Sequence, residues 1–400
     1  MLTLPFAYTP RRGVFSFLAI FSIYVAIYLK DWASQWLTLS VAAGLLALGL
    51  FIGLCGLAVQ RDSYKNNSNL SRLSLGVFVF FSAAWILTFA AKGTANLSSY
   101  YIAVPFAIVI VNLNPNLFYR IIVFHFGVTL AIQVLEYFTG HYFFIYQASD
   151  GTELNELLFG GHAEVFRAKG MFQGPLSAVA FGLLVMFLTR GSTFIAAMVL
   201  FSSFLASGRL GMLTAVIMFG FRYLIMGVNS LRKSFTYAIL LAAVAYFLWA
   251  SMDVSRALFI LNALDFGNDQ NVGRFYFWLS GLSYYLSYGP IDFLFGNQGF
   301  ILMREGGTEN DFLRLLLDCG LVGFLLYGGA IVTLIARAVK SKDFEGVLSA
   351  SLIIVLMNLF PFFQSLSSAL LFWVYFFSKM EQLRGQKPSK AKLSQFTVQS

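Results

Sequence analysis

The sequence predicts an all-α, polytopic membrane protein with about twelve transmembrane helices and a large outward-facing loop. Hydrophobic residues make up 58% of the 400 residues and charged residues only 11%, whereas a soluble domain carries about 25% charged residues. The apolar residues occur in long unbroken runs and not in the short alternating segments of a β-barrel. Composition therefore excludes an ordinary soluble enzyme. No Pro/Ser-rich linker or run of charge divides the chain, so we expect one membrane domain over residues 1–400.

Each apolar run predicts one helix, because about twenty apolar residues cross the hydrocarbon core. The first run follows Arg11 and Arg12 and is succeeded by Lys30, not by a small-residue cleavage site, so we expect a span and not a signal peptide. The run at 100–112 is the weakest. The predicted spans are 13–29, 37–59, 73–91, 100–112, 121–138, 175–189, 192–206, 210–227, 235–251, 312–336, 347–360 and 365–379.

The distribution of charge along the chain predicts the orientation. A cytoplasmic N-terminus places about two thirds of the 27 basic residues on the cytoplasmic side, as the positive-inside rule requires. We therefore expect both termini in the cytoplasm, with a basic tail at 380–400 close to anionic lipid. Two hydrophilic loops then face outward, a smaller one at 139–174 and a larger one at 252–311. The acidic residues expected inside are Asp62, Asp343, Glu345 and Glu381.

Basic residues on the outward side are disfavoured by this rule, so those found there call for a reason. Arg209 lies among Ser207, Gly208 and Gly211, where small residues let backbone N–H groups approach a ligand and a guanidinium can bind phosphate through two bonds. An arginine that extends from a helix end toward the headgroups is the alternative.

Three further basic residues lie in the outward loops. Arg167 and Lys169 precede the span at 175–189 and could equally form an ordinary solvated pair. Arg274 opens an amphipathic, aromatic segment that contains Trp278 and reaches Tyr288; such a segment can stack on sugars or lie among lipid headgroups. With Arg209, these residues could converge on one anionic group, such as a lipid-linked diphosphate.

The same loops supply the candidate proton acceptor. Glu309 follows a Gly-rich stretch and comes directly before the span at 312–336, where a carboxylate could take a proton from an acceptor hydroxyl. Asp311 is the second candidate, and for both the alternative is an acid favoured at a helix N-terminus. His125 inside a span is either a buried polar contact or a functional group. The histidines and the cysteines form no cluster in the sequence, so no metal site and no cofactor are expected.

Five motifs follow one another in an order typical of one family. They are Arg167 to Pro175, matching Arg-x-x-Gly-x-Phe-x-x-Pro; Ser207-Gly208-Arg209-Leu210-Gly211; Gly273-Arg274 with Trp278; Phe295-Gly296-Asn297-Gln298-Gly299; and Asn310-Asp311-Phe312-Leu313 with Gly320-Leu321-Val322-Gly323. In this order, over residues 165–325, the chain resembles the O-antigen polymerase and O-antigen ligase superfamily of bacterial envelope proteins. The ligases carry a histidine before the asparagine, where this chain has Glu309, so the resemblance favours a polymerase.

The resemblance implies a metal-independent glycosyltransferase of the inner membrane that uses undecaprenyl-diphosphate-linked glycans as donor and acceptor at the periplasmic face. It implies catalytic roles for Glu309, Arg209 and Arg274, and substrate binding by Arg167, Lys169, Trp278, Asn310 and Asp311. Membrane lipids, a flippase and a chain-length regulator are the expected partners, and nucleic acid is not. Two alternatives are a ligase that delivers glycan to lipid A core and a transporter of a lipid-linked or anionic solute, which would need polar residues inside the spans.

Overall fold

The computed structural model of the protein describes residues 13–29, 39–59, 68–93, 98–144, 166–172, 174–225, 269–297, 310–359, 362–363 and 365–385. Every regular element in these ranges is a helix, so the all-α prediction is confirmed for the described part of the chain. The predicted span at 235–251 and the tail at 386–400 lie outside the described residues.

Each of the other predicted spans coincides with a helix. Proline stands at the first position of α6, α8 and α14, where its missing N–H costs nothing. In chain order the helices are α1 (Val14–Tyr24) with a π-helical turn (Val25–Leu29), α2 (Leu39–Val59), α4 (Ser68–Lys92), α5 (Ser99–Leu113), α6 (Pro115–Thr139), α8 (Pro175–Leu188), α9 (Thr193–Leu205), α10 (Arg209–Ile225), α13 (Asp269–Leu286), α14 (Pro290–Phe295), α16 (Asp311–Lys340), α17 (Phe344–Leu359) and α18 (Leu366–Gly385).

Four helices in the described residues are long and apolar enough to cross a membrane, which supports a membrane protein. Other apolar helices, such as those at Ser99–Leu113 and Pro175–Leu188, are shorter. The four longer segments are Ser40–Ala58, Leu75–Lys92, Pro115–Thr139 and Asp311–Lys340.

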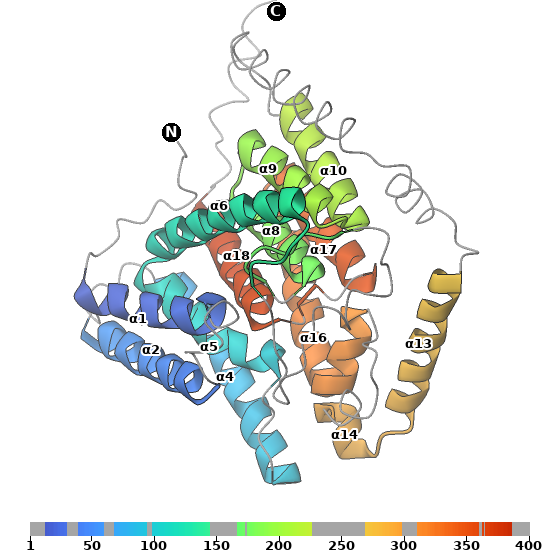
Figure 1. Ribbon diagram of the computed structural model, residues 1–400. Helices are drawn as coiled ribbons and strands as arrows, with labels where there is room; N and C mark the ends of the chain where they lie inside the picture. Colours follow the sequence, from blue (N-terminus) through green and yellow to red (C-terminus); the bar gives the residue numbers. More distant parts are fainter. Residues whose placement is uncertain are drawn as a thin grey trace, which may run out of the picture.

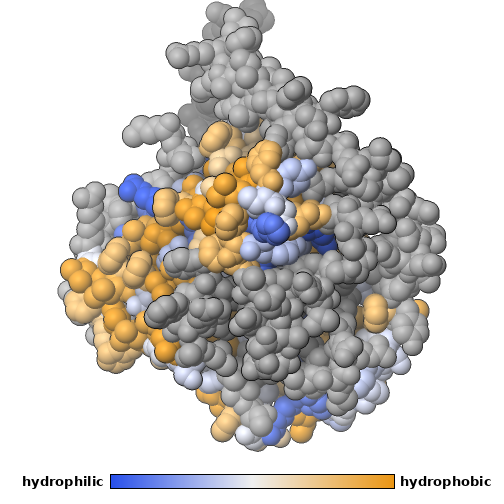
Figure 2. All heavy atoms as spheres, viewed as in Figure 1, coloured by the Kyte–Doolittle hydropathy of each residue, from blue (hydrophilic) through white to orange (hydrophobic). Residues whose placement is uncertain are grey.

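The core lies where α18 packs against α5 and α8 (Figure 1). Aromatic rings fill it: Trp373 of α18 is fully buried and meets Phe81 and Tyr327 edge-on at centroid distances of 5.9 and 5.1 Å. The α1–α2 pair forms one side of the molecule. Figure 2 shows hydrophobic residues over that side, in agreement with the exposure of Phe15, Phe21 and other apolar residues. An exposed apolar surface of this kind is suited to contact with lipid.

Two boundaries differ from those the sequence predicts. α13 begins at Asp269, so Arg274 lies in its second turn and not at a helix start; an acid at the first position suits the positive end of the helix dipole. α18 continues to Gly385, into the predicted tail. Met380 and Leu383 are buried there, and their packing extends the helix.

The large predicted loop contains α13 and α14, and two glycines bring α14 onto α16. Gly296 and Gly320 both have positive φ, 77° and 64°, and each lies so close to the other segment's backbone that a Cβ would collide with it. The N–H of Asn297 donates to the carbonyl of Leu317 at 2.6 Å. The fourth and fifth motifs therefore meet in one contact.

Candidate functional site

The first motif forms a compact turn, residues 166–172, that we call the Arg167 turn. It lies against the connection between α9 and α10. The N–H of Ala168 donates to the carbonyl of Leu205 at 3.0 Å, and Nε of Arg167 donates to the carbonyl of Ala206 at 3.2 Å. Because α10 begins at Arg209, the turn places the first motif beside the second.

The α9–α10 connection is a tight turn, closed by its backbone conformation and by a backbone hydrogen bond. Ser207 adopts a positive φ of 51°, and the N–H of Gly208 donates to the carbonyl of Ser203 at 2.8 Å. A Cβ at Gly208 would stand 2.6 Å from Val179, and one at Gly211 would also collide with it. Glycines in the second motif thus let α10 pack closely on α8.

The far side of the Arg167 turn is held by α6. Glu136 is completely buried, and its Oε2 accepts hydrogen bonds from the N–H groups of Lys169 and Gly170, both at 2.8 Å. Nε2 of Gln133 donates to the carbonyl of Ala168 at 3.4 Å. Gly170 has a φ of 60°, and a Cβ there would stand 2.8 Å from the carbonyl oxygen of Thr129.

Lys169 is buried, with 1% of its surface exposed, so it is not half of a solvated loop pair. Its ammonium lies 5.1 Å from the ring centroid of Tyr142, within cation–π range. The Tyr142 hydroxyl donates to the carbonyl of Arg167 at 3.1 Å. Burial and the nearby Glu136 charge raise the pKa of Tyr142, so its phenol keeps this proton at neutral pH.

A second buried carboxylate begins α16. Asp311 is fully buried; the Tyr100 hydroxyl donates to its Oδ1 at 2.7 Å and the N–H of Phe363 to its Oδ2 at 2.6 Å. Asn310 caps the helix by accepting from the N–H of Leu313 at 3.0 Å, and its Nδ2 donates to the carbonyl of Asn358 at 3.1 Å. Asn310 and Asp311 therefore fix the start of α16, and both carboxylate oxygens of Asp311 already have donors in this conformation.

A chain of contacts leads from the Arg167 turn toward Asp311. Phe172 meets His125 edge-on at 5.8 Å, and the His125 ring lies 5.7 Å from that of Tyr28. The Tyr28 hydroxyl donates to the carbonyl of Ser367 at 3.0 Å, at the start of α18. His125 is buried and its Nδ1 lies 3.0 Å from the hydroxyl of Tyr24, which confirms the predicted buried polar contact.

The remaining predicted residues are placed only in part. Arg209 is the first residue of α10 and Arg274 lies in α13, but their side chains and all of Glu309 lie outside the described atoms. Trp278 of α13 is half-buried and packs beside Tyr285, Leu313 and Leu317, which joins α13 to the first turns of α16.

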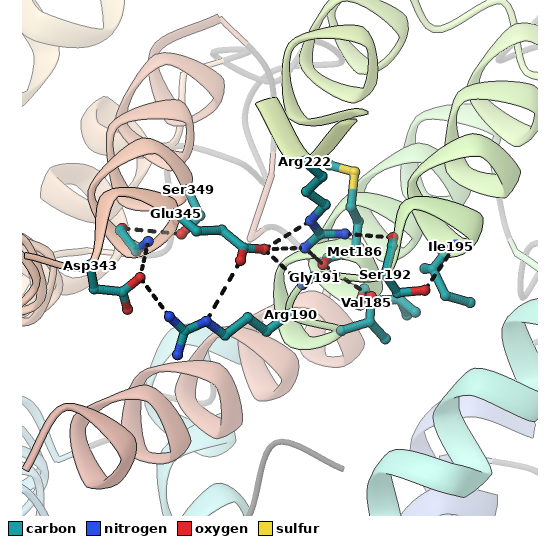
Figure 3. Close-up of polar contacts among 12 residues, drawn as sticks. Val185, Met186, Arg190, Gly191, Ser192, Ile195, Arg222, Asp343, Glu345 and Ser349 are labelled. Atoms are coloured by element: carbon teal, nitrogen blue, oxygen red, sulfur yellow. Dashed lines mark hydrogen bonds and ion pairs between the residues drawn. The ribbon is translucent and has the colours of Figure 1, made fainter. Parts of the chain in front are cut away.

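The opposite ends of α8 and α16 carry a feature that sequence analysis missed (Figure 3). Arg222 of α10 pairs with Glu345 of α17 at 2.7 Å, and Arg190 pairs with Asp343 at 3.2 Å and with Glu345 at 3.7 Å. Lys379 of α18 completes this Arg222 network by pairing with Asp343 at 2.6 Å. Arg222 is 2% exposed and also donates to carbonyl oxygens of α8 and of the α8–α9 connection. One sequence signal could have indicated this network: Asp343 and Glu345 lie two residues apart in a region with few other acidic residues.

No group of metal-binding side chains occurs among the described residues. Comparison of the sequence with models of known protein families and with curated proteins finds no match.

Proposed function

We propose that this protein polymerises undecaprenyl-diphosphate-linked oligosaccharide repeat units into a cell-surface polysaccharide. It would act at the periplasmic face of a bacterial inner membrane, as a glycosyltransferase without nucleotide or metal. The supporting observation is that the Arg167 turn packs on the connection that leads into Arg209. Two outward-predicted arginines thereby start from nearby backbone, from which both guanidinium groups could bind one diphosphate.

The reaction would exchange one bond to the anomeric carbon of the donor glycan. A sugar hydroxyl of the acceptor attacks that carbon, the bond from carbon to phosphate oxygen breaks, and the hydroxyl proton passes to Glu309. The departing lipid diphosphate keeps the bonding electrons, and Arg209 and Arg274 would stabilise its charge, with Arg167 and Lys169 in support. Asn310 and Asp311 would position Glu309, because their own polar groups already hold the start of α16.

The arrangement of charges agrees with the predicted orientation. Three residues expected outside lie near the beginnings of α8, α10 and α16: Arg167, Arg209 and Asp311. The members of the Arg222 network, all expected inside, lie toward the far ends of these helices or on α17 and α18. One end of the bundle would then hold the lipid-linked substrates and the other would face the cytoplasm.

A specific observation favours a transporter as the second candidate. His125, Thr129, Gln133 and Glu136 recur at helical spacing on one face of α6, and all are buried. Buried polar residues within a span are what transport requires.

Purified protein reconstituted with lipid-linked repeat units alone separates the candidates. A polymerase should form a ladder of longer glycans without nucleotide or metal. A protein that forms no ladder but moves the lipid-linked unit between leaflets is a transporter. In a second reaction with added lipid A core, transfer of glycan to that core with no ladder would make it a ligase.

A further inference from the structure

The last turn of α6 contains a carboxylate where helix electrostatics disfavours one. α6 ends at Thr139, and Glu136 lies within the turn before that end, where the unpaired carbonyls give the helix dipole its negative pole. Glu136 is also fully buried, and a buried carboxylate needs strong donors. Its position therefore requires compensation from outside the helix.

The Arg167 turn supplies two backbone donors and the Lys169 charge, and the backbone of Phe143 supplies a third donor. The N–H groups of Lys169 and Gly170 converge on one oxygen of Glu136, as successive backbone N–H groups do around an anion. Gly170 has a positive φ, which disfavours other residues, and Thr129 leaves no space for a Cβ there. Hydrogen bonds to a carboxylate are stronger than those between neutral groups.

Gln133, about one turn before Glu136 on α6, also binds the backbone of the Arg167 turn. Its amide nitrogen donates to the carbonyl of Ala168, and the hydroxyl of Ser202 on α9 donates to its amide oxygen at 2.7 Å. One face of α6 thus fixes the backbone of the turn, whose opposite side bonds to the α9–α10 connection. Without Glu136, nothing among these contacts would satisfy the N–H groups of Lys169 and Gly170.

We propose that Glu136 is a positioning residue for the lipid-diphosphate donor, acting through the Arg167 turn. This inference rests on the proposed function. Glu136 does not touch the donor; it holds the backbone that carries Arg167 and Lys169 against the start of α10, and so keeps these cations beside Arg209. Donor binding should depend on it more strongly than the chemical step does.

The kinetic test is Glu136→Gln in the reconstituted ladder assay. Glutamine keeps the shape but offers a neutral acceptor, with bonds about half as strong, so KM for the donor should rise about tenfold while kcat changes little. A residue needed only for folding would reduce the amount of active protein and leave KM unchanged. Glu381→Gln, at the far end of α18, is the matched control and should behave as wild type.

A structural readout makes the result independent of the assay. Ala168 is fully buried, so in a protein with Cys55 and Cys319 replaced, the thiol of Ala168→Cys should resist a maleimide. Adding Glu136→Gln should expose it to labelling. An unchanged KM in Glu136→Gln would overturn the inference, whatever the labelling. A wild-type protein that forms no ladder would overturn the proposed function itself, and labelling would then assign Glu136 to the fold alone.

Discussion

The Arg167 turn and the Arg222 network both bury cationic side chains, but they use their carboxylates differently. In the network, Asp343 and Glu345 pair directly with guanidinium and ammonium groups at 2.6 to 3.7 Å. At the turn, Glu136 accepts from backbone N–H groups, while Arg167 donates to a carbonyl and Lys169 lies over an aromatic ring. The carboxylates of the network therefore hold helices together, whereas the carboxylate of Glu136 fixes the backbone conformation of the Arg167 turn.

This difference separates a structural role from a binding role. A cation paired with a buried carboxylate has its charge neutralised within the protein. At the turn, Arg167 donates to a carbonyl, which carries no full charge, and Lys169 lies over an aromatic ring, although Lys169 also interacts electrostatically with the Glu136 carboxylate. Variants in the network should accordingly affect stability, and variants at the turn should affect donor binding and activity.

The largest effect is expected from Arg222→Met. Removing one partner of a buried pair leaves the Glu345 carboxylate buried without its main counter-charge, which costs about 3–5 kcal/mol. Thermal unfolding of the purified protein should show the loss. The double variant Arg222→Met/Glu345→Met should recover much of it, because no lone charge remains. A single variant as stable as wild type would remove the network from the account.

The next effect is expected from Arg209→Ala, and it should appear in activity. Loss of one charged contact to the departing diphosphate should reduce ladder formation about 10²- to 10³-fold, with thermal stability near wild type. Arg209→Lys keeps the charge without the two-pronged geometry and should retain part of the activity. Full activity in Arg209→Ala would reduce this residue to an anchor at the headgroups.

A smaller effect should follow from Gly170→Ala. Alanine at a φ of 60° is strained, and its Cβ would collide with Thr129; such strain costs about 1–3 kcal/mol. The variant should lose stability modestly and weaken donor binding together, because the turn must shift from α6. Gly93→Ala, where φ is 68° and nothing lies near the added Cβ, is the control for backbone strain alone. Equal effects of the two on donor binding would show that the Thr129 contact is unimportant.

Local sequence patterns were enough to predict most of the helices, because an apolar run acts within a few residues of the chain. They also marked Gly296 and Gly320 as motif residues. The close approach of these two glycines, which joins α14 to α16, is a tertiary contact that no local pattern predicts. Glu136 was missed because a glutamate in the last turn of a helix has no local signature of its partners, which lie 33 and 34 residues further along the chain.

The Arg222 network was missed for the same reason on a larger scale. Arg222 and Glu345 are 123 residues apart, and each alone fits the pattern of charges at a cytoplasmic helix end. Lys169 was expected as a substrate-binding residue or as part of a solvated pair; its burial against Tyr142 depends on how residues 142 and 169 are brought together. The composition of the loop at 139–174 could not show that the Lys169 side chain is buried.

We propose that this chain joins lipid-linked glycans and that Glu309 accepts the acceptor's proton. The most direct measurement compares wild type, Glu309→Gln and Asp311→Asn in the reconstituted assay with lipid-linked repeat units and no nucleotide or metal. We predict a ladder of longer glycans from wild type and none from Glu309→Gln, which should still bind the donor because its arginines are intact. Asp311→Asn should retain a reduced ladder, since Asp311 supports the start of α16 and does not take the proton. A normal ladder from Glu309→Gln, or no ladder from wild type, would contradict the account.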